Sequence, residues 1–299
     1  MPRVAVTGGS GGLGRFCVGA LLDARWDVVA IDRVRGNELR AHYVDIDLTD
    51  FGQTLEALSG VDGLYDSIDA VVHLAAIPAP GITTSSRTFQ NNITATHNVF
   101  LAAKTLGIDR VVFASSETVL GLPFTTPPVG IPVTEDFEPR PESTYAMVKV
   151  LEETMAKIFC QWNPALTMTA LRFSNVINPE WYPEFPSYDA DPQLRRWNLW
   201  GYVDARDAAS VVVLALDRTD PGFDVFIVAA ADTVMSRPNS KLITAEFPGV
   251  PVAEGLSEHA TLLSIDKARR VLNYRPQYSW RDVPAEPSKS KRARKGGSQ

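Results

Sequence analysis

A glycine-rich turn near the N-terminus constrains the fold of this chain more than any other segment. The turn, Thr7-Gly8-Gly9-Ser10-Gly11-Gly12-Leu13-Gly14, separates an apolar run at residues 4–7 from a helical stretch at residues 15–24. A second apolar run follows at residues 27–31, and this order predicts a parallel βαβ unit. Glycines at positions 8, 11 and 14 permit a tight turn, close helix packing and the approach of a pyrophosphate to a helix N-terminus. Because any α/β protein can use glycine in such a turn, the motif alone leaves a phosphate site and a plain turn both open.

The same order of elements continues along the chain. Further strand candidates lie at residues 70–74, 110–114, 168–172 and 225–228, with helical stretches between them. Short apolar strands that alternate with helices are typical of a parallel sheet covered on both faces. We therefore predict an α/β fold, a Rossmann-type doubly wound parallel sheet with a small, discontinuous C-terminal substrate-binding domain. The cofactor-binding part is expected at residues 1–177 and 202–231, and the substrate-binding part at residues 178–201 and 232–282.

The composition is that of a folded, acidic protein. Hydrophobic residues make up 45% and charged residues 21% of the chain, which excludes a disordered protein, a coiled coil and a collagen-like fibre. The formal net charge is −6 although residues 289–299 carry only basic charges, so the body is more acidic still. An acidic body argues against nucleic acid as a partner. With only Cys17, Cys160 and four scattered histidines, we predict no disulfide framework and no metal site.

The location of the protein is also constrained by what the sequence lacks. No apolar run approaches the ~20 residues of a membrane helix, and a strand-like run from Arg3 leaves no room for a signal peptide. We therefore expect no membrane partner and a cytoplasmic protein.

Two segments interrupt the alternation of strands and helices. Residues 178–192 hold four prolines and four aromatic residues, which is too much proline for a helix or a central strand. We predict an ordered loop there. Residues 283–299 have no large apolar residue beyond Val283, so a disordered basic tail is expected. A nuclear localisation or polyanion-binding signal at residues 289–295 is the alternative reading of that tail.

Asp32 adds a second signal to the glycine turn. It ends the second predicted strand about 20 residues after the turn, where a carboxylate accepts hydrogen bonds from the adenosine ribose and repels a 2′-phosphate. A solvated aspartate at a strand end is the structural alternative. The neighbouring Arg33 and Arg35 could bind such a phosphate, so NAD is the predicted cofactor and NADP is left open.

Tyr145 and Lys149 form a Tyr-x-x-x-Lys pair in a helical stretch, which places both side chains on one face. Such a pair is weak evidence by itself in a chain with eight tyrosines. Its chemistry is specific, because a tyrosine with an ordinary pKa near 10 needs adjacent positive charge to exchange protons near pH 7.

Several motifs in a fixed order make the assignment stronger than any one of them. From residue 4 to about residue 280 the chain resembles the extended short-chain dehydrogenase/reductase family, the NAD-dependent epimerase/dehydratase group, and in particular its small members such as uronate dehydrogenases. Besides the glycine turn and the Tyr145-Lys149 pair, the matching segments are Asp47-Leu48-x-Asp50, His73-Leu74-Ala75-Ala76, Asn92 with Thr96, Phe113-Ala114-Ser115-Ser116, Val119-Leu120-Gly121, Leu171-Arg172-Phe173-Ser174-Asn175-Val176 and Tyr202-Val203-Asp204-Ala205-Arg206-Asp207.

The resemblance implies a role for each matching position. Tyr145 would be the catalytic acid/base, Lys149 would hold the nicotinamide ribose and lower the tyrosine pKa, and Ser116 would bond the reacting oxygen. Asn92 would support the site from behind, as a catalytic residue or by bonding backbone. The expected cofactor-binding residues are Gly8, Gly11, Gly12, Leu13, Gly14, Asp32, Arg33, Asp47, Leu48, Leu74, Ala75, Ala76, Asn92, Tyr145 and Lys149, and the expected substrate-binding residues are Ser115, Ser116, Asn175, Arg195 and Arg196.

Departures from the family pattern bear on the substrate. Sugar 4,6-dehydratases of the family carry an Asp-Glu pair where this chain has Glu117 and Thr118, so dehydration is disfavoured. The segment at residues 177–201 is shorter than in nucleotide-sugar epimerases, which favours a small substrate. Arg195 or Arg196 could bind an anionic group through a bidentate guanidinium, or could form a solvated surface pair. The aromatic residues at 181–188 could stack on a sugar ring or close the pocket.

The sequence therefore predicts an NAD-dependent oxidoreductase that acts on a hydroxyl or carbonyl of a sugar or other small polyol. A UDP-sugar 4-epimerase is the alternative enzyme. A binding protein that senses NAD(P) is the alternative from another class, although the intact Ser116, Tyr145 and Lys149 argue against it. The family resemblance also implies a homodimer that pairs through the helices at residues 92–106 and 145–159.

Overall fold

The computed structural model describes residues 1–36 and 40–283. The predicted tail therefore lies, except for Val283, outside the described residues. In chain order the elements are β1 (Arg3–Thr7), α1 (Gly14–Asp23), β2 (Asp27–Asp32), β3 (His42–Asp45), α2 (Phe51–Ser59), β4 (Ala70–His73), α3 (Ser85–Leu106), β5 (Arg110–Ser116), η1 (Glu117–Leu120), α4 (Thr144–Trp162), β6 (Thr167–Phe173), β7 (Val176–Ile177), η2 (Pro179–Asp189), α5 (Gln193–Arg196), β8 (Val203–Asp204), α6 (Ala205–Leu216), β9 (Gly222–Val228), α7 (Asn239–Glu246), α8 (Asp266–Val271) and η3 (Trp280–Asp282).

The central sheet has seven strands in the order β3-β2-β1-β4-β5-β6-β9, and every pairing in it is parallel. The chain moves outward from β1 to β3, returns to β4 beside β1, and then moves outward on the other side. This reversal is the topological switch point of a doubly wound sheet, where ligands bind outside the carboxyl ends of the strands. The predicted Rossmann-type α/β fold is confirmed.

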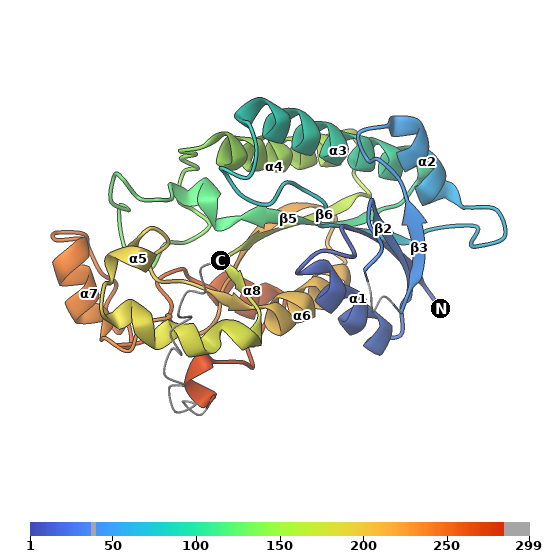
Figure 1. The fold of residues 1–299 in the computed structure, drawn as a ribbon. Helices are drawn as coiled ribbons and strands as arrows, with labels where there is room; N and C mark the ends of the chain where they lie inside the picture. The colour runs from blue at the N-terminus through green and yellow to red at the C-terminus, as the bar shows by residue number, and fades with distance from the viewer. Residues whose placement is uncertain (37–39, 284–299) are drawn as a thin grey trace, which may run out of the picture.

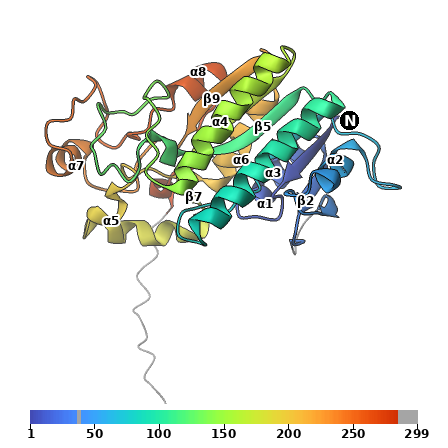
Figure 2. The same cartoon turned by 90° about the horizontal axis from the view of Figure 1, so that it is seen from above.

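Helices cover both faces of the sheet (Figure 1). Figure 1 shows α2, α3 and α4 over one face and α1 and α6 over the other, and the helices pack as neighbours within each layer. Seen from above, α3 and α4 run side by side across the sheet, and α5 and α7 lie at one end of the molecule (Figure 2). Strands covered on both faces need apolar side chains throughout, which explains why all seven residues of β6 are buried.

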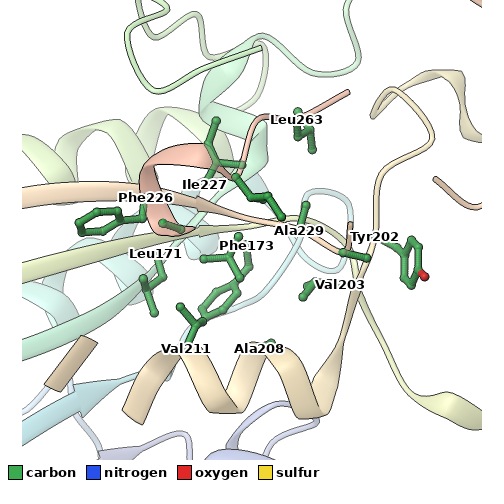
Figure 3. Packing of buried hydrophobic residues seen from close by; sticks show 14 of the residues in the cluster. Leu171, Phe173, Tyr202, Val203, Ala208, Val211, Phe226, Ile227, Ala229 and Leu263 are labelled. Carbon is green, nitrogen blue, oxygen red and sulfur yellow. The ribbon is translucent and has the colours of Figure 1, made fainter. Parts of the chain in front are cut away.

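The core between β6, β9 and α6 shows how this burial is achieved. Phe173 and Leu171 of β6 face Ala208 and Val211 of α6, and all four side chains are buried (Figure 3). The small alanine lets the helix approach the sheet closely, while the larger side chains fill the space between them. This packing fixes the end of β6, and with it the residues that follow toward the carboxyl edge.

The predicted loop at residues 178–192 is wrong in its main part, because residues Pro179–Asp189 form the 3-10 helix η2. Proline fixes φ near −65°, which suits the backbone of a 3-10 helix. With three residues per turn, Tyr182 and Phe185 lie on one face. Both are buried and contact the Tyr202 ring, with centroid distances of 6.2 Å and 5.2 Å.

The segment after η1 joins the C-terminal part of the chain. Ile131 forms a parallel bridge with Val252, and Val133 forms one with Leu263. Residues 131–133 thus pair with a stretch that the sequence assigns to the substrate-binding part, although they fall in the predicted cofactor-binding part. The division into two domains stays a prediction.

Candidate active site

A cavity of about 740 Å³ lies along the carboxyl edge of the sheet. It extends from the glycine turn and the end of β2 to the ends of β5 and β6 and the first turns of α4. The structure brings most of the predicted residues together in its lining: Gly8, Gly11, Gly12, Leu13, Gly14, Asp32, Arg33, Asp47, Leu48, Leu74, Ala75, Ala76, Ser115, Ser116, Tyr145, Lys149 and Asn175.

The glycine turn is packed too tightly to carry side chains at two positions. Gly8 has a φ of 72°, and a Cβ atom there would lie 2.7 Å from the Ala75 backbone nitrogen. A Cβ atom at Gly14 would lie 2.0 Å from the Gly8 carbonyl oxygen. The turn therefore brings bare backbone to the start of α1, as a phosphate-binding cradle requires.

Carboxylates border the cavity at the end nearest β2 and β3. Asp32 accepts hydrogen bonds from the backbone N–H of Ser10 at 3.1 Å and of Arg33 at 2.8 Å. These bonds hold the Asp32 carboxylate at the mouth of the glycine turn, where a ribose would lie. Asp47 accepts from the Thr49 N–H at 2.9 Å and from its hydroxyl at 2.8 Å, and these bonds lower the Asp47 pKa.

The start of α4 positions the predicted acid/base. The Ser143 side chain caps the helix by accepting from the Ala146 N–H at 3.1 Å. Tyr145 lies in the first turn and Lys149 one turn later, and both side chains are buried and line the cavity. The Ser116 hydroxyl at the end of β5 lies beside the phenol and accepts from the Thr118 hydroxyl at 2.9 Å.

Lys149 is held by two groups besides the tyrosine. Its ammonium donates to the Ala114 carbonyl and to the Glu152 carboxylate, both at 2.8 Å, and lies 5.8 Å from the centroid of the Tyr145 ring. Burial opposes the charged lysine, but the charges of Glu152, Tyr145 and Glu153 outweigh it, so the Lys149 pKa is raised. The lysine therefore stays an ammonium at the site.

The pKa of Tyr145 departs from the expectation that Lys149 would lower it. Burial raises the Tyr145 pKa above 10, and the negative charges of Glu152 and Glu117 add to the rise. Lys149 and the Ser116 hydroxyl act in the expected, lowering direction but do not prevail. In the protein alone, burial and the two carboxylates thus outweigh the effect of Lys149 on the phenol.

Behind Lys149 a chain of buried hydrogen bonds leads back to the glycine turn. Glu152 accepts from the Thr96 hydroxyl at 2.9 Å, and Thr96 is 3.0 Å from His73 Nε2. His73 Nδ1 is 2.7 Å from the hydroxyl of Thr7, the residue before Gly8. Burial and the charge of Lys149 lower the His73 pKa to about 3. The imidazole is therefore neutral and links the two threonines.

Polar side chains surround the opposite end of the cavity, beyond Ser116. Glu117 is buried and accepts from the Ser174 hydroxyl at 2.6 Å and from the Asn198 amide at 3.1 Å. Burial raises the Glu117 pKa to about 7. Trp181 and Trp197 line the same end. An acid, polar groups and aromatic faces together suit a small hydroxylated ligand.

The sequence pattern of the NAD dependent epimerase/dehydratase family matches residues 4–229. The chain belongs to this family. The matched region contains the glycine turn, Asp32, Ser116, Tyr145 and Lys149, so the geometry above is that of an NAD-using enzyme of the epimerase/dehydratase type. The bare-backbone cradle and the carboxylate of Asp32 fit the two ends of the adenosine diphosphate half of NAD.

Curated relatives of this chain include two kinds of enzyme. UDP-glucose 4-epimerase of Bacillus subtilis is 28% identical over 181 residues, which cover 58% of this chain and 52% of that protein. L-arabinose 1-dehydrogenase (NAD(P)(+)) of Haloferax volcanii is 35% identical over 167 residues, covering 53% and 61% respectively. The chain thus spans about half the length of the curated relatives it matches.

A short-chain dehydrogenase/reductase superfamily protein from Agrobacterium tumefaciens, solved with bound NAD, has the same fold. It superposes with a TM-score of 0.69 at 24% identity, and the match covers 93% of this chain and 94% of that one. The agreement extends through the C-terminal part of the chain, which the family pattern does not reach.

Three predicted residues of the family site lie outside the cavity lining. Asn92 is fully buried and clamps the backbone of Ile77, accepting at 2.8 Å and donating at 3.0 Å, which fits its predicted supporting role. Arg195 is buried and donates to the Gly201 carbonyl at 2.8 Å, while Arg196 lies 3.5 Å from Glu246. A direct substrate contact by either arginine stays a prediction.

Ser115 lines the cavity, but its hydroxyl has another partner. It donates to Glu153 at 2.6 Å, and Glu153 also receives two hydrogen bonds from Arg172 at 2.9 Å and 2.8 Å. This buried cluster ties β5 and β6 to α4. The predicted substrate contact of Ser115 stays a prediction.

Sequence reasoning missed Glu152 as a partner of the lysine and treated Glu117 only as a departure from the dehydratase pattern. Glu152 follows Lys149 by three residues, the spacing of side chains that meet on a helix. An acid at this position therefore indicates an ion pair with the lysine. The contact between Glu117 and Asn198 spans 81 residues and leaves no local signal. Within residues 1–36 and 40–283, no cluster of three or more possible metal ligands occurs. In that same part of the chain, no helix combines the length and apolarity needed to cross a membrane.

Proposed function

We propose that the chain is an NAD-dependent dehydrogenase that oxidises a hydroxyl of a small free sugar or similar polyol. The observation that carries this proposal is the charge of the cavity lining. Among the described residues that line it, the only cations are Arg33, beside Asp32, and Lys149, which is paired with Glu152. A nucleotide sugar brings a diphosphate, which proteins commonly bind with arginine or lysine. The end beyond Ser116 offers none.

Each residue of the site has a defined task in such a reaction. The Tyr145 phenolate would take the proton of the substrate hydroxyl as the carbinol carbon is oxidised. The Ser116 hydroxyl would donate to the same oxygen and fix its position, which aligns the carbon for reaction. Lys149 would bind the ribose hydroxyls beside the nicotinamide and contribute positive charge next to the phenol.

NAD, when bound, supplies the hydride acceptor and a positively charged ring. Because the pKa of Tyr145 is raised in the protein alone, the positive charge of the ring would also act on the phenol. A cation close to the phenol favours the phenolate, so the tyrosine is expected to become an effective base only in the complex with oxidised cofactor.

The test is a screen for NADH formation at 340 nm on the purified full-length chain, with neutral aldoses, uronic acids and UDP-sugars offered separately with NAD. Stoichiometric NADH from a free sugar is the expected result. Turnover confined to UDP-sugars would contradict the proposal. If no free sugar gives NADH although the enzyme is shown to bind NAD, the proposal is also contradicted.

A UDP-sugar 4-epimerase is the second candidate, favoured by the curated relatives named above and by further 4-epimerases at 27–29% identity. It would use the same oxidation and then return the hydride to the opposite face of the carbonyl group, so that no net NADH forms. Chromatography of UDP-glucose and UDP-galactose after incubation separates it from a dehydrogenase. A protein that only senses NAD(P) would show binding without either product.

We also propose that the chain forms a homodimer through α3 and α4. These helices lie side by side on one face, and α4 exposes a row of apolar side chains, Met147, Leu151 and Ile158. Their spacing of four and seven residues places them on one stripe of the helix. Light scattering is expected to give twice the chain mass of 32.7 kDa, and Leu151→Glu should shift it toward the monomer while Glu184→Gln, at an exposed position of η2, should not.

A further inference from the structure

Glu117 is a charged side chain of the cavity to which the proposed reaction gives no task. It follows Ser116 directly, lines the cavity and is only 3% exposed. One carboxylate oxygen receives the Ser174 hydroxyl at 2.6 Å and the other receives the Asn198 amide at 3.1 Å. The Asn175 backbone N–H also lies within hydrogen-bonding reach of this carboxylate. Since a carboxylate has about four acceptor positions, these three groups leave it able to accept more.

The positive charge of Arg195 acts on Glu117, and bridging groups connect the two side chains. Asn198 donates both to Glu117 and to the Gly201 carbonyl, the latter at 2.9 Å, and Arg195 donates to that same carbonyl at 2.8 Å. Arg195 also lies over the rings of Tyr188 and Trp197, with distances of 5.4 Å and 5.6 Å to their centroids. Arg195 therefore offsets the buried negative charge of Glu117 from outside the cavity lining, without a direct ion pair.

This arrangement presents the substrate with an acceptor and not with a cation. An ionised carboxylate is a hydrogen-bond acceptor only, and it pairs well with vicinal hydroxyl groups. A second anion brought beside it in the cavity would meet like-charge repulsion. Ser174 and Asn175, which line the same wall, add further polar groups but no positive charge.

We propose that Glu117 is a specificity-determining residue that selects neutral polyhydroxylated substrates and excludes those with a carboxylate or phosphate near the reacting carbon. Its carboxylate accepts hydrogen bonds from hydroxyls next to the carbinol held by Ser116 and Tyr145. The inference rests on the proposed dehydrogenase function and narrows its substrate class to neutral sugars and polyols, as against the uronic acids.

The test uses pairs of sugars that differ only at C6, a neutral hydroxymethyl group in one and a carboxylate in the other, such as D-galactose with D-galacturonate and D-glucose with D-glucuronate. For each pair, kcat/KM for NADH formation is measured at about pH 8.5, above the Glu117 pKa of about 7, where the carboxylate is ionised. The wild-type chain is expected to favour the neutral sugar by roughly 100-fold, as expected when a buried polar group is mismatched.

Three variants separate charge from shape. Glu117→Gln keeps the shape and removes the charge, and it should raise the uronate-to-aldose ratio at least ~10-fold. Glu117→Asp keeps the charge and should retain a ratio close to that of the wild type, even if the aldose rate falls. Glu184→Gln removes a charge of the same sign from an exposed position of η2 and should change nothing. Melting temperature and NAD affinity of each variant show that the fold is intact.

An unchanged ratio in a folded Glu117→Gln variant would overturn the inference, and so would equal losses for both members of a pair, which would indicate a structural role. A different result would contradict the proposed function: the wild-type chain would form no NADH from any free sugar. Calorimetric binding of the same pairs to the NAD complex then decides about Glu117 independently of turnover. Weaker binding of the uronate to the wild-type chain, restored in the Glu117→Gln variant, supports the proposed role of Glu117. If neither sugar binds, that role is contradicted.

Discussion

The ammonium of Lys149 lies 2.8 Å from the carboxylate of Glu152, three residues further along α4, and both side chains are buried. The lysine that follows Tyr145 by one helical turn is thus one half of a buried ion pair. Through Thr96 and His73 the same carboxylate is connected to β1 and the glycine turn. The charge beside Tyr145 is consequently influenced by groups that lie outside the cavity lining.

Replacement of Glu152 by glutamine is expected to move the pH profile of the reaction. Glu152 raises the pKa of both Tyr145 and Lys149, so removal of its charge should lower both. The base form of the tyrosine then persists to lower pH, and the acidic limb of kcat/KM for oxidation should shift to lower pH. The other groups near Lys149 and Tyr145 that carry charge or titrate are Glu153 of α4, His73 of β4 and Glu117 of η1.

The Glu152→Gln variant should also be less stable, by about 3 kcal/mol, because it leaves a buried ammonium without its partner. A denaturant titration measures this loss. If the protein folds and its pH profile coincides with that of the wild type, the ion pair has no influence on the tyrosine.

Tyr145→Phe is expected to reduce kcat roughly 10²–10⁴-fold, the usual contribution of general acid/base catalysis. Phenylalanine keeps the ring that packs near Lys149 and removes only the hydroxyl. NAD affinity, measured by calorimetry, should therefore stay within a few-fold of the wild type. A variant with nearly normal turnover would show that another group moves the proton.

Asp32→Asn should weaken discrimination against NADP. The Asp32 carboxylate, held by the Ser10 and Arg33 backbone N–H groups, accepts from ribose hydroxyls and repels a 2′-phosphate. Without its charge, the ratio of kcat/KM for NADP to that for NAD is expected to rise about 10-fold. Arg33, which lines the same end of the cavity, would then favour the phosphate. If kcat/KM falls equally with NAD and with NADP, Asp32 only supports the glycine turn.

Acid should destabilise the protein through His73. Its pKa is about 3 in the fold and about 6.5 in an unfolded chain. The folded-state pKa is depressed, so this contribution to stability is present above pH 6.5 and is lost as the pH falls toward 3. One proton taken up on unfolding corresponds to about 1.4 kcal/mol per pH unit.

The comparison that isolates this effect is the pH dependence of the unfolding free energy in wild type and His73→Gln. Over the interval between the two pKa values, the wild-type curve should fall more steeply on acidification. Parallel curves would mean that His73 is not the titrating group. Glu117 and Asp207 act with the opposite sign, because burial raises their pKa to about 7 and about 6, so their contributions are lost as the pH rises.

Signals that span a few residues can be interpreted from the sequence alone. The glycine turn, the aspartate at the end of β2 and the Tyr145-Lys149 spacing each depend on one turn, one strand end or one helix face. The strand candidates at 70–74 and 110–114 agree with β4 and β5 to within one or two residues at each end. The loop predicted at 178–192 failed because proline was weighed against α-helix and strand, while the segment adopts a 3-10 helix.

The sequence by itself thus determined the sheet, the family, and the positions of Ser116 at the end of β5 and of Tyr145 and Lys149 in the first two turns of α4. Only the tertiary structure decided what surrounds them. Thr96 meets Glu152 across 56 residues and Glu117 meets Asn198 across 81. Arg195 donates to the Gly201 carbonyl and does not line the cavity. Local propensity acts over neighbouring residues, whereas such contacts arise from the order of strands in the sheet, and burial then sets the pKa values and the charge of the substrate wall.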